Sequence, residues 1–96
     1  MIFVIDNLKY DTDKMEIISR KCRYLYPADL YGDFVNNYGR ETILWKSKKG
    51  NWLITYKKGS NSTVYAEALT STQAMSLLVQ YDIETYEKMF GEIEEA

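Results

Sequence analysis

The chain has 96 residues, of which 46% are hydrophobic and 27% are charged, and this size and composition predict one globular domain spanning residues 1–96. It contains no histidine, which removes the most common general base and the most common metal ligand. Its single cysteine, Cys22, excludes an intrachain disulfide. The apolar run near the N-terminus has no basic region before it and is too short to span a membrane, so we expect a cytoplasmic protein without membrane contact.

The two parts of the chain carry opposite charge. Residues 1–58 hold eleven basic and seven acidic residues, a net charge of +4, whereas residues 59–96 hold one basic and seven acidic residues, a net charge of −6. This asymmetry is compatible with a partner of either sign, and equally with two charged faces that only contact water.

The first forty residues predict strands and one irregular segment. The apolar run 2–5 suits a strand, and turn-forming residues follow at 11–13. Residues 15–26 predict a long strand that ends at the only proline, Pro27. Residues 28–40 mix turn formers with aromatic residues, and we expect a loop with one helical turn.

Residues 42–58 predict a β-hairpin with Gly50 in its turn. We expect a two-residue turn at Lys49 and Gly50, because a three-residue turn would mix apolar and polar residues on both faces. In this register one face consists of Ile43, Trp45, Trp52, Ile54 and Tyr56. The other face consists of Leu44, Lys46, Lys48, Leu53, Thr55 and Lys57. The aromatic residues are then core residues and not a platform for stacking nucleic acid bases.

The C-terminal third predicts a strand and two helices. A strand over 63–69 leads to a capping box in which Thr70 is the N-cap and Gln73 reaches back to it. Asp82 is expected to cap a second helix that ends at Gly91, with an apolar stripe of Ile83, Tyr86 and Phe90. The predicted fold class is α+β, with a mostly antiparallel sheet of four to five strands and the two C-terminal helices packed on one face.

No pattern in the sequence indicates an enzyme. Cys22 has no histidine partner and is better explained as a buried structural residue. The glycines are scattered and form no phosphate-binding loop, and a turn accounts for Asp11 and Asp13 without a metal. We therefore expect no catalytic, cofactor-binding or metal-binding residues.

Three surfaces are candidate contacts for a partner. The acidic set could enter a groove that normally holds nucleic acid, or could simply be solvated, and consists of Asp82, Glu84, Glu87, Glu92, Glu94 and Glu95. The basic set could bind nucleic acid phosphates, or could serve only as a soluble sheet face, and consists of Lys46, Lys48, Lys49, Lys57 and Lys58. The third candidate is the aromatic loop of Tyr31, Phe34 and Tyr38.

The order of several short motifs resembles a family of short uncharacterised proteins of Gram-positive bacteria, their phages and other mobile elements. The motifs are Tyr10-Asp11-Thr12-Asp13, Gly32-Asp33-Phe34, Glu41-Thr42, Leu44-Trp45-Lys46, Lys48-Lys49-Gly50-Asn51-Trp52, Asp82-Ile83-Glu84-Thr85-Tyr86-Glu87 and Phe90-Gly91. They span nearly the whole chain, but the family's glycine-rich segment is only partly kept, as Gly59-Ser60-Asn61-Ser62. The resemblance implies a mobile-element origin and a bacterial host, and it brings no activity and no catalytic residues.

Analogy with small acidic phage proteins completes the functional expectation. We expect a non-enzymatic protein-binding inhibitor, specifically an anti-CRISPR protein that blocks a Cas nuclease or its DNA binding. The alternatives are a small nucleic-acid-binding module that uses the lysine-rich hairpin face, and a self-associating structural or assembly protein.

Overall fold

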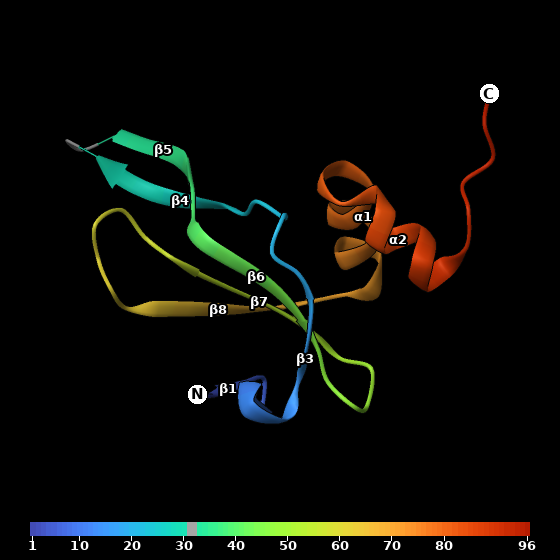
Figure 1. Ribbon diagram of the computed structural model, residues 1–96. Helices are drawn as coiled ribbons and strands as arrows, with labels where there is room; N and C mark the ends of the chain where they lie inside the picture. The colour runs from blue at the N-terminus through green and yellow to red at the C-terminus, as the bar shows by residue number, and fades with distance from the viewer. Residues whose placement is uncertain (31–32) are drawn as a thin grey trace.

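A four-stranded antiparallel sheet forms the centre of the molecule (Figure 1). The computed structural model describes the backbone of residues 1–30 and 33–96, and the side chains outside 28–36. The elements in chain order are β1 (Ile2–Ile5), β2 (Leu8–Asp11), the 3-10 helix η1 (Thr12–Lys14), β3 (Glu16–Ser19), β4 (Leu25–Leu30), β5 (Asp33–Tyr38), β6 (Arg40–Lys46), β7 (Trp52–Lys57), β8 (Val64–Leu69), α1 (Ser71–Tyr81) and α2 (Ile83–Phe90). This is the predicted α+β class, with strands first and two helices last.

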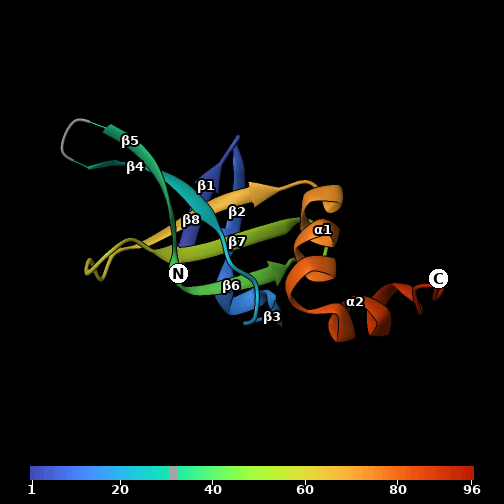
Figure 2. The ribbon, with the colours of Figure 1, turned by 90° about the horizontal axis from the view of Figure 1, so that it is seen from above.

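The central sheet has the order β3-β6-β7-β8, and two hairpins stand apart from it. One hairpin is formed by β1 and β2 and the other by β4 and β5, both antiparallel. Figures 1 and 2 show the helices on one side of the sheet and the β1–β2 hairpin on the opposite side. The central sheet is therefore covered on both faces.

The register of the β6–β7 hairpin differs from the predicted one by one residue. Trp45 lies opposite Leu53, and Leu44 lies opposite Ile54. The Gly50 amide donates to the Ser47 carbonyl, and the Ser47 amide donates to the Asn51 carbonyl, which closes a three-residue turn. Gly50 has a φ of 88°, as a type I turn followed by a glycine bulge requires. The two-residue turn was thus the wrong prediction.

The new register redistributes the predicted faces. Leu44, Trp52 and Ile54 share the face under the helices, where the core also contains Cys22, Ala74 and Leu78. Trp45 and Thr55 lie on the other face, where the indole Nε1 donates to the Thr55 hydroxyl over 2.8 Å. Both Leu53 and Ile54 are fully buried although they point to opposite faces. Trp45 and Trp52 are therefore not neighbours on one face.

The segment before β6 also differs from expectation. The long strand predicted over 15–26 is broken into β3 and β4, and Pro27 lies within β4 opposite Asn36. The predicted loop over 28–40 is largely the β4–β5 hairpin. Proline fits there because a two-stranded ribbon leaves outward-facing amides without a ladder partner. The chain then passes over Tyr56 at Gly39, where a Cβ atom would lie 2.7 Å from the Tyr56 Cβ.

The helix boundaries agree with the sequence predictions. The Gln73 amide donates to the Thr70 hydroxyl, and the Thr70 amide donates to the Gln73 side chain, which completes the capping box. Asp82 is the N-cap of α2, and Gly91 ends it with a φ of 98°. Asp82 also ends α1, because its amide donates to the Leu78 carbonyl. One residue therefore serves both helices.

Candidate binding surfaces

The acidic C-terminal surface combines carboxylates with exposed apolar side chains. Helix α2 has no buried residue, and only its Tyr86 and Met89 pack against the core. Ile83 and Phe90 remain 46% and 42% exposed. The predicted apolar stripe is therefore divided between core and solvent. We define the helix surface as these two residues, the exposed Val79 and Ile93, and the exposed carboxylates of Glu84, Glu92, Glu94 and Glu95.

Two members of the predicted acidic set have structural roles. Asp82 is 6% exposed, and its carboxylate accepts hydrogen bonds from the hydroxyls of Ser19 over 2.6 Å and Thr85 over 2.8 Å. Burial raises the pKa of Asp82, but the hydrogen bonds from Ser19 and Thr85 outweigh it, so the pKa lies below its usual value. Glu87 is half-buried, and its carboxylate accepts from the Ile93 amide over 3.0 Å. Both carboxylates are therefore engaged within the protein and are not free to contact a partner.

The lysines of the predicted basic set are distributed over different places. The Lys57 ammonium pairs with Glu41 over 2.6 Å, and this hydrogen bond and charge lower the pKa of Glu41. Lys58 lies over the rings of Tyr65 and Tyr26, with its ammonium 4.3 and 5.2 Å from the ring centroids. The set is thus not one continuous face.

Lys58 belongs to a tyrosine cluster that sequence patterns did not indicate. Tyr24, Tyr26 and Tyr65 all pack around Tyr56, with ring centroids 4.9 to 6.0 Å from its own. Burial, followed by the Glu67 carboxylate, raises the pKa of Tyr56 to about 12. The cluster joins β4, β7 and β8, elements whose pairing is not visible in local sequence. Its aromatic faces contact one another and Lys58.

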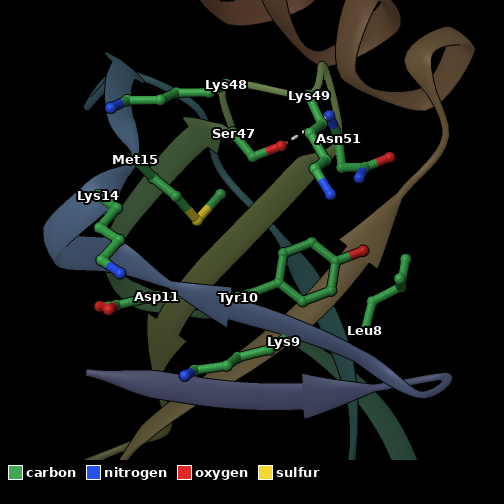
Figure 3. Close-up of a pocket in the computed structure, with 10 residues that line it drawn as sticks. All are labelled: Leu8, Lys9, Tyr10, Asp11, Lys14, Met15, Ser47, Lys48, Lys49 and Asn51. Atoms are coloured by element: carbon green, nitrogen blue, oxygen red, sulfur yellow. Dashed lines mark hydrogen bonds between the residues drawn. The ribbon is translucent and has the colours of Figure 1, made fainter.

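Lys48 and Lys49 lie at the tip of the β6–β7 hairpin beside two lysines from the start of the chain. Figure 3 shows Lys49 and Asn51 reaching from the turn toward the ring of Tyr10, with Lys9 and Lys14 on the β2–η1 side. Together these residues line a shallow cavity of about 390 Å³, which we call the lysine cavity. Lys9 and Lys14 were not predicted to belong with them, because β2 and η1 approach this turn only through tertiary packing.

The predicted aromatic loop is only partly described. Tyr31 lies outside the described residues, as does the side chain of Phe34. Tyr38 is an exposed residue of β5, and the Arg23 guanidinium lies 3.7 Å from its ring centroid. Tyr38 is therefore a strand residue with a cationic neighbour.

The remaining features bear on chemistry. Cys22 is buried as predicted, and burial raises the pKa of its thiol. Among the side chains that the structure describes, no three His, Cys, Asp or Glu lie together as a metal site needs. No helix in the described part of the chain has the length and apolar character needed to cross a membrane.

No family model, curated protein or solved structure matches this chain.

Proposed function

We propose that this protein is a non-enzymatic inhibitor of phage or mobile-element origin, and specifically an anti-CRISPR protein that binds a Cas nuclease and blocks its DNA binding or cleavage. The observation that carries the proposal is the helix surface. Its apolar side chains Ile83 and Phe90 are almost half exposed and are accompanied by carboxylates. Contiguous exposed apolar patches rimmed by polar residues mark protein interaction sites, and we propose that these side chains form such a patch.

The negative charge of the helix surface favours a partner that presents a basic surface. Residues 59–96 carry a net charge of −6, and the exposed glutamates of α2 and the following tail belong to this part. A Cas nuclease holds nucleic acid in a positively charged channel. Carboxylates can occupy such a channel in place of phosphates, and the apolar residues add the buried contact area that gives affinity. The resemblance to mobile-element proteins supports the same proposal.

The first experiment mixes the full chain with purified Cas effector complexes. The protein should co-elute with one of them in size-exclusion chromatography and reduce cleavage of target DNA. Clean separation from every complex, together with undiminished cleavage, would contradict the proposal.

A charge-reversal variant locates the contact. Glu84→Lys with Glu94→Lys should weaken partner binding strongly, since like charges facing each other across an interface cost several kcal/mol. Both side chains are exposed, so Glu94→Lys should alter the free energy of unfolding by less than about 0.5 kcal/mol, and Glu84→Lys, in the first turn of α2, should cost about 1 kcal/mol or less. Glu87 is unsuitable for this variant because it holds the Ile93 amide.

The matched control reverses the same number of charges elsewhere. Lys48→Glu with Lys49→Glu, at the tip of the β6–β7 hairpin, should leave partner binding unchanged. The opposite result, loss of binding in the lysine variant and retention in the glutamate variant, would assign the interaction to nucleic acid instead.

A further inference from the structure

The lysine cavity brings together residues from two parts of the chain. β2 and η1 supply Lys9 and Lys14, and the β6–β7 turn supplies Lys48 and Lys49 (Figure 3). The three-residue turn places Lys48 and Lys49 on consecutive turn positions, directly before Gly50. The cavity is built from elements other than those of the helix surface, so the two surfaces are separate.

The cavity has an excess of positive charge. Among its lining side chains, Asp11 is the single carboxylate against four lysines. One Asp11 carboxylate oxygen already accepts a hydrogen bond from the Asp13 amide over 3.1 Å. The ion pairs among the described side chains, Met1 with Asp13 and Lys57 with Glu41, include none of the four. Figure 3 shows their ammonium groups on different sides of the cavity, with that of Lys49 directed toward Tyr10, so they border the cavity and do not converge on one point.

The cavity also has neutral groups suited to a larger ligand. The Ser47 hydroxyl accepts a hydrogen bond from the Asn51 backbone amide over 3.0 Å, which fixes the turn. The Asn51 side chain itself lines the cavity (Figure 3). Tyr10 is only 6% exposed, so the apolar surface of the cavity comes mainly from Leu8, which is 49% exposed, and from Met15. At about 390 Å³, the cavity falls within the range of small-molecule sites.

We propose that the lysine cavity binds a nucleoside phosphate, with the phosphates on the lysines and the base or sugar against the apolar side formed by Leu8 and Met15. Lysine binds phosphate as a mobile point charge. A purely inorganic anion would leave the apolar side unused, and an apolar ligand would leave four charges unpaired. A nucleoside phosphate has both a charged and a flat, weakly polar part. The proposal goes beyond the inhibitor function and does not depend on it.

The test titrates the full chain, labelled with ¹⁵N, with ATP, adenosine, inorganic phosphate and a 5′-phosphorylated single-stranded oligonucleotide at low salt. ATP should shift the amide resonances of Tyr10, Lys48 and Asn51 and reach saturation. Adenosine should give no saturable shift, and inorganic phosphate should bind about tenfold or more weakly than ATP. Tighter binding of the oligonucleotide would support the site and identify a nucleic acid strand, not a free nucleotide, as the source of the phosphate.

A matched pair of variants distinguishes ATP binding in the cavity from a general attraction of ATP to positive charge on the protein. Lys48→Ala with Lys49→Ala should weaken ATP binding about tenfold or more, because it removes two charged hydrogen-bond donors. Lys21→Ala with Lys88→Ala removes the same charge from exposed positions outside the cavity and should leave ATP binding unchanged. Equal losses in the two variants, equal affinity for inorganic phosphate and ATP, or no saturable shift with ATP would each overturn the proposal.

Discussion

Asp82 connects three elements through a single buried carboxylate. Its side chain accepts from Ser19 after the bulge of β3 and from Thr85 in α2, while its amide bonds to Leu78 in α1. Removal of the carboxylate leaves the Ser19 hydroxyl and the Thr85 amide without their acceptor. A buried donor that loses its acceptor costs more than the hydrogen bond contributed.

Asp82→Ala should lower the free energy of unfolding by about 2–4 kcal/mol, since it removes an N-cap and leaves buried donors unpaired. Urea denaturation followed by circular dichroism measures this change. Glu84→Ala, on an exposed side chain two residues away, is the control and should change stability by less than about 0.5 kcal/mol. A variant at Asp82 as stable as the control would show that the carboxylate contributes nothing to the junction.

The lowered pKa of Asp82 predicts a pH dependence of stability. In the unfolded chain an aspartate has a pKa of about 3.9, and in the folded chain the pKa of Asp82 is lower. The stabilisation is therefore fully present above about pH 4 and is lost as the pH falls through the folded-state pKa. Asp82→Asn lacks this titration, so its stability deficit relative to the original chain should shrink in acid. Urea titrations at a series of pH values test this, and a deficit independent of pH would refute it.

At the scale of single elements, the helices were predictable because their signals are local. Thr70, Gln73, Asp82 and Gly91 act within four residues of the groups that they satisfy. The β6–β7 hairpin was recognisable, but its register was not, because Gly50 suits a two-residue turn and a three-residue turn alike. One residue of difference reverses which side chains share a face.

The same distinction explains which parts of the candidate site were predictable. Lys48 and Lys49 were identified because they flank a recognisable turn, whereas Lys9 and Lys14 join them only through packing between distant segments. Asp82 was correctly predicted as a cap. It was also predicted to contact a partner, because the sequence does not reveal that its carboxylate is buried and accepts from the Ser19 hydroxyl. Local chemistry was predictable, and long-range pairing was not.

At the scale of the whole molecule, the main feature is a sheet enclosed from both sides. Every residue from Trp52 to Tyr56 is buried, so β7 shows no alternation of buried and exposed side chains. Alternation predicts a half-exposed strand and fails where both faces are covered. The β1–β2 hairpin covers one side of the sheet and the helices cover the other (Figures 1 and 2), while Tyr24 and Tyr26 pack on Tyr56 at the end of β7.

The two-sided burial predicts that Leu53→Ala and Ile54→Ala are similarly harmful. Each should lower the free energy of unfolding by about 2–4 kcal/mol, because each opens a cavity at a fully buried position on one face. Leu25→Ala, at a side chain that is 48% exposed, is the matched control and should cost much less. Thermal or urea unfolding of the three variants measures the differences. If Leu53→Ala costs no more than the control, the β1–β2 hairpin does not seal its face of the sheet.

The shared cap at Asp82 also sets the rotational phase between α1 and α2. With no linker between the helices, one inserted residue would turn α2 by about 100° around its axis. Such a rotation would carry Tyr86 and Met89 away from the core, and an insertion directly after Asp82 would also separate the Thr85 amide from its acceptor. Among homologues, this junction should therefore tolerate substitutions on the outer side of α2 but neither an insertion nor a deletion. Chain length at this point is a structural constraint as strict as residue identity.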